Sequence, residues 1–190
     1  MEGAYRCTMR LPAELETPRL WLRRPARADA EAVFERYASD AVVTRYLSWP
    51  RHVSIGETRA FIDASERLWA ATGVGPYLAF RDGQLVGSTG LQLETPYRAE
   101  TGYVLARDAW GQGLATELAT AMVRLAFTVA GVVRLSAVCH ADHAASARVL
   151  EKAGFAREGV LRRFAVFPSL GSADPADVLL YACVRYSRTT

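Results

Sequence analysis

The sequence predicts a mixed α/β domain in which helices pack on a single β-sheet. Its 190 residues are enough for one domain with a substantial core. Its composition, 51% hydrophobic and 23% charged, is typical of a folded globular protein. Segments with strand and helix periodicity alternate along the chain in the order β-α-α-β-β-β-α-β-α-β-β.

The first third of the chain predicts one strand and two helices. Leu20-Trp21-Leu22 forms a strand that stops before Pro25, and a helix follows from Ala28 to Ala38. Residues 44–54 are an aromatic loop. The second helix ends at Gly73, and one face of it carries Phe61, Ile62, Ser65, Leu68, Trp69 and Thr72. Residues 1–15 show no periodicity, so we expect them to form a loose extension.

The middle of the chain predicts a hairpin, a strand and a long helix. Tyr77–Phe80 and Leu85–Leu93 flank the turn Asp82-Gly83, and the strand 100–106 follows Pro96. The next helix, from about Gly113 to Ala130, directs an apolar face inward through Leu114, Leu118, Met122, Leu125 and Val129.

The last third predicts three strands and a short helix. The buried strand 132–139 leads to a helix that Asp142 caps and Gly154 ends. The strands 155–166 and 178–186 then follow, separated by a loop with glycine and proline residues at 168–175.

Composition excludes several functional classes. No apolar run approaches the roughly 20 residues that cross a bilayer, and the N-terminus lacks an apolar signal core. The three cysteines contain no close pair, which disfavours disulfides and a zinc site and indicates a reducing, cytoplasmic compartment. The net charge of +3 is scattered, so we expect neither nucleic acid nor membrane as a partner.

A glycine turn between a strand and a helix is the strongest functional signal. It reads Trp110-Gly111-Gln112-Gly113-Leu114-Ala115-Thr116-Glu117. The first turn of a helix has unpaired N–H groups and a partial positive charge, which together favour a phosphate. The turn lacks the third glycine of a dinucleotide fingerprint and the Gly-Lys-Ser/Thr of a Walker A loop. A pyrophosphate-bearing cofactor of another kind is therefore expected.

Four motifs resemble those of the GNAT superfamily of N-acetyltransferases, in particular its RimJ/RimL-like branch, which acetylates ribosomal-protein N-termini. They are Glu16-Thr17-Pro18-Arg19-Leu20, Tyr46-Leu47-Ser48-Trp49-Pro50, the glycine turn, and the segment from His143-Ala144-Ala145-Ser146 to Glu151-Lys152-Ala153-Gly154-Phe155. The resemblance runs from about Glu16 to Arg185, and the aromatic Trp110 is typical of this branch. The spacing of the last two motifs makes the match specific.

The resemblance implies a single N-acetyltransferase domain over residues 16–190. Its fold would be one mixed, mostly antiparallel sheet with helices on both faces and a splayed gap between the fourth and fifth strands, 100–106 and 132–139. Acetyl-CoA would be the co-substrate, without a metal. Pantetheine would lie in the gap and bond the backbone near Val104 and Leu105. The remaining cofactor contacts would come from Trp110, Gly111, Gln112, Gly113, Leu114, Ala115, Thr116, His143 and Ser146.

Two residues are candidates for the chemistry. Glu100 matches the position of the general base, which would take a proton from the attacking amine directly or through water. Ser146 is the candidate acid for the departing thiolate and a candidate CoA contact, because Leu150 stands where many family members place a proton-donating tyrosine. His143 replaces a family asparagine, so it either keeps the cofactor contact or simply begins the helix. Cys139, inside an apolar strand, is expected to be inert packing.

The acceptor is less well specified. Tyr46 and Trp49 belong to the loop that walls the acceptor site in the family, whereas Trp69 is expected in the core. A protein N-terminal α-amine is favoured. The alternatives are a small amine, such as an antibiotic, a polyamine or an amino acid, and a non-catalytic acyl-CoA sensor. The apolar last strand and the family make a homodimer plausible.

Overall fold

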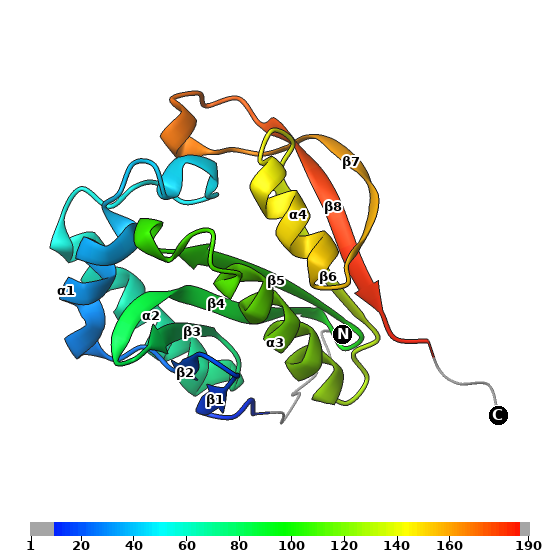
Figure 1. Cartoon of the computed structure of the whole chain (residues 1–190), viewed down its shortest axis with the longest axis horizontal. Helices are drawn as coiled ribbons and strands as arrows, with labels where there is room; N and C mark the ends of the chain where they lie inside the picture. Colours follow the sequence, from blue (N-terminus) through cyan, green and yellow to red (C-terminus); the bar gives the residue numbers. More distant parts are fainter. Residues whose placement is uncertain (1–9, 187–190) are drawn as a thin grey trace, which may run out of the picture.

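An eight-stranded mixed sheet organises the chain, which a computed structural model describes over residues 10–186 (Figure 1). The strands lie in the order β1-β2-β3-β4-β5-β6-β8-β7. All neighbours are antiparallel except β5 and β6, which run parallel. The strand bounds are β1 Glu14–Glu16, β2 Trp21–Arg23, β3 Pro76–Arg81, β4 Gln84–Thr95, β5 Arg98–Leu105, β6 Arg134–His140, β7 Ala156–Ala165 and β8 Ala176–Val184.

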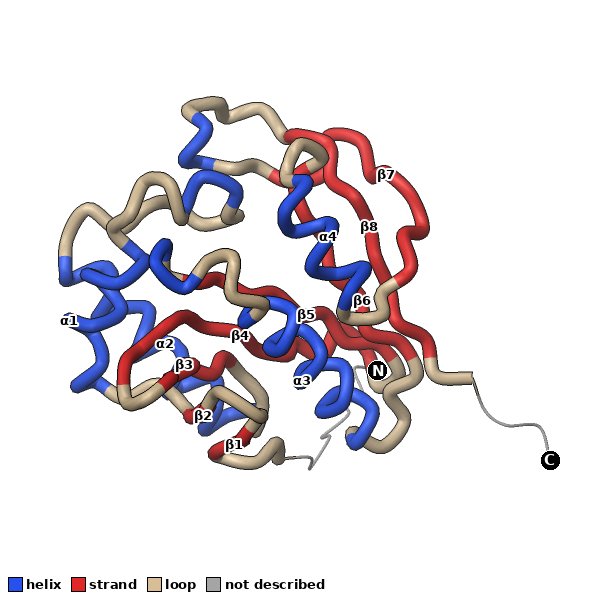
Figure 2. The backbone as a smooth tube through the Cα atoms, in the orientation of Figure 1, coloured by secondary structure: helices blue, strands red, loops and turns tan. Residues whose placement is uncertain are grey.

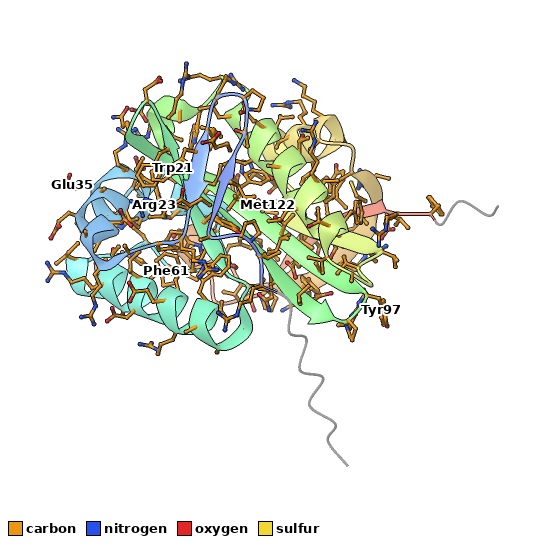
Figure 3. All side chains as sticks on the ribbon, turned by 90° about the horizontal axis from the view of Figure 1, so that it is seen from below. Trp21, Arg23, Glu35, Phe61, Tyr97 and Met122 are labelled. Carbon is orange, nitrogen blue, oxygen red and sulfur yellow. The ribbon has the colours of Figure 1, made fainter. Side chains whose placement is uncertain are left out.

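Helices cover both faces of this sheet (Figure 3). On one face lie α1 (Ala30–Val33), the π-helical turn η2 (Phe34–Ala38) and α2 (Ile55–Thr72). On the other face lie α3 (Leu114–Thr128) and α4 (Ala144–Lys152). Short 3-10 turns complete the chain at η1 Arg27–Asp29, η3 Thr44–Tyr46, η4 Arg107–Ala109 and η5 Pro168–Leu170. Among residues 10–186, no helix is long and apolar enough to cross a membrane.

The sheet splits between β5 and β6. These strands pair only where Arg98–Glu100 meets Arg134–Ser136, yet β5 continues to Leu105 and β6 to His140. Beyond the paired residues the two halves of the sheet diverge (Figure 2). The predicted fold, including the splayed gap, is therefore confirmed.

The loose extension expected over residues 1–15 is contradicted for the part of it that the structure describes. Residues 1–9 lie outside the described part, but Leu11 is buried at 4% exposure and its N–H bonds the Gly73 carbonyl. Glu14–Glu16 pairs with β2 as an edge strand. The expected loose extension over 1–15 is thus packed from Leu11 onward. The short Glu-Leu-Glu strand was not predicted because it carries one apolar residue.

Two helix details differ from expectation, one at Leu68 in α2 and one at Asp142 before α4. The second helix begins at Ile55, where the Glu57 carboxylate accepts hydrogen bonds from the Val53 and Ser54 N–H groups, at 2.6 and 3.4 Å. Leu68, predicted on the same face of this helix as Ile62 and Trp69, is 47% exposed and lines a cavity, whereas those two residues are buried. Asp142 does not cap α4, because the N-cap residue is His143, which makes no side-chain capping bond.

Candidate active site

A cavity of about 580 Å³ opens where β5 and β6 diverge. Its walls come from β4, β5 and β6, from α1, η2, α2 and α4, and from the loops before α2 and after β7. It brings together six of the predicted site residues, namely Tyr46, Trp49, Glu100, Val104, His143 and Ser146. Its volume is in the range of small-molecule sites.

The backbone of β5 presents alternate residues to the gap. The Ala106 N–H bonds the Val86 carbonyl, so the backbone groups of Val104 point to β4, and those of Tyr103 and Leu105 point toward β6. The Leu105 carbonyl already accepts a bond of 2.9 Å from the Trp110 indole N–H. Val104 therefore contributes its side chain to the cavity, whereas backbone groups of Tyr103 and Leu105 face the gap.

Glu100 lies near the start of the split, with its side chain on the same side of β5 as Val104, the side that α1 and α2 cover. It is half-buried. Burial raises the pKa of its carboxyl, and the adjacent Glu94 carboxylate raises it further. A carboxylate with a raised pKa is a better proton acceptor near neutral pH.

Tyr103 and Ser146 meet on the opposite side of β5. The Tyr103 hydroxyl lies 2.8 Å from the Ser146 Oγ and 3.2 Å from the Ser146 carbonyl oxygen. Burial raises the pKa of Tyr103 to about 12, against the opposing effect of the Ser146 bond. Tyr103 was not among the predicted residues. The signal that could have identified it is strand alternation, which places it on the face that α3 and α4 cover.

His143 stacks on the aromatic loop. Its ring centroid lies 4.7 Å from that of Tyr46, and the His140 ring lies 4.9 Å from the same tyrosine. Burial lowers the pKa of His143, and His140 lowers it further, so the imidazole is neutral at neutral pH. The stack ties the loop before α2 to the start of α4 and closes one wall of the cavity.

The glycine turn lies outside this cavity and begins α3. Gly111 and Gly113 have φ of +73° and +77°, and Gly113 is the N-cap residue without a capping side chain. The first N–H groups of the helix therefore have no side-chain partner. Leu114 is buried, whereas Ala115 and Thr116 are partly exposed. This arrangement fits a phosphate group.

Arg19, in the segment just before β2, holds the glycine turn through hydrogen bonds. Its guanidinium bonds the Gln112 carbonyl at 2.8 Å and the Glu117 carboxylate at 2.7 Å. Glu117 also accepts bonds from the Thr17 hydroxyl and the Arg19 N–H, at 2.5 and 2.8 Å. Burial acts to raise the pKa of Glu117, but these bonds lower it overall, so the carboxylate stays charged and paired.

The Gln112 side chain is also held by protein groups. It accepts a bond of 2.6 Å from Arg81 and donates one of 2.8 Å to the Asp108 carbonyl. Trp110 is 46% exposed beside the turn. Gln112 and Trp110 thus shape the turn, and their side-chain polar groups already have protein partners.

The other end of the cavity is aromatic. Trp49 and His52 have ring centroids 5.2 Å apart, and His52 and Phe61 have centroids 6.5 Å apart. Tyr37 is 2% exposed, and its hydroxyl makes no hydrogen bond with any residue in 10–186 although Ser88 lies beside it. Cys139, expected to be inert packing, lines the cavity; burial raises the pKa of its thiol.

Known proteins match the chain at the level of sequence and fold. The acetyltransferase (GNAT) domain matches residues 19–156. The uncharacterized N-acetyltransferase YoaA of Bacillus subtilis is 34% identical over 175 residues, which cover 90% of this chain and 96% of YoaA.

Two solved structures share the fold. RimL, a ribosomal L7/L12 α-N-protein acetyltransferase in complex with coenzyme A, is 23% identical with a TM-score of 0.78, covering 92% of this chain and 97% of that one. MccE, the microcin C7 self-immunity acetyltransferase in complex with acetyl-CoA and AMP, is 19% identical with a TM-score of 0.81, covering 92% and 97%.

Proposed function

The chain belongs to the GNAT family of acetyltransferases, and on that premise we propose that it transfers the acetyl group of acetyl-CoA to a primary amine inside the cavity between β5 and β6. One observation carries the proposal: Glu100 lines the cavity from one side of β5, and the Tyr103–Ser146 pair lies on the other side. A proton acceptor and a proton donor thus flank the gap.

The residues fit acetyl-CoA, which supplies an activated thioester. The uncapped start of α3 and the left-handed glycines offer backbone N–H groups to a pyrophosphate. The backbone of Tyr103 and Leu105 faces the gap where a pantetheine chain would bond. Arg19 neutralises Glu117, which would otherwise place a negative charge beside the anion site.

Each catalytic side chain has one task in this reaction. Glu100 takes the proton of the amine, directly or through water, so that nitrogen can form its bond to the acetyl carbon. Ser146, bonded to Tyr103, donates a proton to the sulfur as the carbon–sulfur bond breaks. Transfer is direct, because the Cys139 thiol is neutral and poorly suited to carry the acetyl group.

A protein N-terminal α-amine is the favoured acceptor. Its reference pKa of about 7.7–8.0 lies below the roughly 10.4 of a lysine, so less help is needed from the base. RimL acts on a ribosomal protein N-terminus, which supports this choice. The second candidate is a small amine, which a cavity of about 580 Å³ is large enough to hold.

Incubation with acetyl-CoA and a mixture of peptides and small amines tests the proposal. We expect free CoA thiol to appear only when an amine is present, with a matching acetylated product in the mass spectrum. Glu100→Gln and Ser146→Ala should both slow this release. An acyl-CoA sensor would instead bind acetyl-CoA and release no thiol with any amine, and that result would reject the proposal.

A further inference from the structure

The aromatic end of the cavity carries little charge. Among residues 10–186, Glu100 is the one carboxylate that lines the cavity, and no lysine or arginine does. Glu94 lies beside Glu100 but does not line the cavity, and its carboxylate is 3.6 Å from the Arg98 guanidinium. Once Glu100 receives the amine that reacts, the described cavity wall therefore offers no second carboxylate for another ammonium. The described residues that line the cavity also include no lysine or arginine that could pair with a carboxylate or a phosphate on the acceptor.

The groups that line this end are apolar or neutral. They are the rings of Trp49 and Phe61 and the aliphatic side chains of Val33 and Val43, which pack in one cluster with Tyr37. Burial lowers the pKa of His52, although Glu57 opposes the shift, so its imidazole adds no positive charge at neutral pH. Such a lining favours apolar surface and penalises an unpaired charge.

One polar group at this end lacks a partner. The Tyr37 hydroxyl is buried, belongs to the cavity wall, and makes no hydrogen bond within the described chain. A buried hydroxyl without a partner is uncommon in folded proteins. This oxygen has almost no accessible surface and Ser88 lies beside it, so it faces no ligand and adds no charge to the cavity wall. A carboxylate on the acceptor would meet no counter-ion among the described residues that line the cavity.

We propose that the acceptor is a primary amine joined to an uncharged apolar or aromatic group, and that this cavity excludes polycationic amines and amines bearing a carboxylate. The inference rests on the proposed function and narrows its acceptor. Polyamines, aminoglycosides and free amino acids are then poor substrates. Arylalkylamines, amino-acid amides and peptides with an apolar N-terminal residue share the required chemistry.

Matched amines test this acceptor class. Phenylalanine amide and phenylalanine share a side chain and differ in the carboxylate, and spermidine supplies a polycation of similar length. We expect kcat/KM, calculated on the free-base amine, to be at least about 100-fold higher for the amide than for the other two. Phenethylamine and a peptide that begins with phenylalanine then distinguish a small acceptor from a protein terminus.

A variant pair tests the location. Trp49→Ala should lower kcat/KM for phenylalanine amide about tenfold, mainly through KM, and should weaken calorimetric binding of the amide to the CoA-loaded protein. Trp21→Ala removes an indole that lies on β2 (Figure 3) and does not line the cavity, so it should change neither quantity. Trp49→Phe, which keeps a ring, should restore most of the binding if Trp49→Ala is poorly folded.

The outcomes separate the two proposals. Equal use of spermidine or phenylalanine overturns the acceptor class but leaves acetyl transfer intact. Unchanged kinetics and binding in Trp49→Ala overturn the location. If no amine is acetylated while acetyl-CoA still binds, the proposed function fails, and this inference fails with it.

Discussion

Glu100 combines a strand position predicted from the sequence with a pKa that the fold raises. Burial and Glu94 both disfavour its ionised form. A base with a raised pKa loses activity at a higher pH than an ordinary glutamate as the solution is acidified. We therefore expect the pH dependence of the reaction to reflect how far burial raises the pKa of the Glu100 carboxyl.

Replacing Glu100 tests this role kinetically. Glu100→Gln should lower kcat/KM by about 100-fold or more, because general-base assistance contributes on that order. The wild-type profile should show an acidic limb above the usual glutamate range, and the variant should lack it. A variant that keeps both the rate and the limb would remove Glu100 as the base.

The same substitution tests the cost of burial. The folded state holds the Glu100 proton to a higher pH than the unfolded chain does, so this group lowers stability as pH rises through that window. Glu100→Gln removes the penalty. Urea unfolding at pH 4 and pH 8 should show a larger stability gain of the variant over wild type at pH 8. An equal gain at both pH values would contradict the raised pKa.

At the scale of elements, the glycine turn and α3 form one unit with the N-terminal strand region. Arg19 reaches Glu117 across 98 residues of sequence and also holds the Gln112 carbonyl. The turn is thus fixed from two directions while the helix N–H groups remain uncapped. Gly113 adopts the left-handed φ of +77° at the N-cap without the strain that a side chain would bring.

Gly113→Asp tests the anion site with a matched control. The added carboxylate would occupy the start of α3, so CoA affinity should fall at least about tenfold, or about 1.4 kcal/mol. Gly171→Asp places the same residue at a φ of +75°, against +77° for Gly113, in the loop between β7 and β8. Calorimetry should show CoA binding retained in Gly171→Asp. Equal affinities in both variants would reject the turn as the pyrophosphate site.

Periodicity predicted the helices and most strands, because burial on one face leaves a regular pattern of apolar residues. The face of α3 that carries Leu118 and Met122 is an example, since both are fully buried. The sequence does not predict the β1 strand, because hydrogen bonding to β2 at the edge of the sheet holds it and it has no run of apolar residues. Glu100 and Ser146, which the motif resemblance singled out, both line the cavity, and their catalytic roles stay predictions. Contacts such as Tyr103 with Ser146 depend on how distant elements pack, which a single sequence does not encode locally.

At the scale of the whole molecule, the splayed sheet opens one cavity, with the proposed proton donor Ser146 toward one end and aromatic rings toward the other. The divergence of β5 from β6 opens it, α4 supplies Ser146, and the loop before α2 supplies the aromatic wall. Gly102 lies between these ends on β5. A Cβ added there would meet no atom within 4 Å.

Filling that space tests whether the cavity is the reaction site. Gly102→Val should fold normally, because valine suits a strand and the space is open. The side chain should obstruct the cavity and lower the acetylation rate about tenfold or more, in line with the loss expected for blocking a close-fitting site. Gly159→Val on β7 adds the same side chain into open space outside the cavity and should retain activity. Full activity in Gly102→Val would place the reaction elsewhere.

The central claim is that acetyl-CoA runs from the glycine turn into the gap between β5 and β6. Amide hydrogen exchange with and without saturating CoA tests it most directly. Bound CoA should slow exchange in peptides that cover 103–106, 111–117 and 143–147 and should leave the edge strand 156–165 unchanged. If CoA binds and exchange slows only outside those three segments, the claim is contradicted.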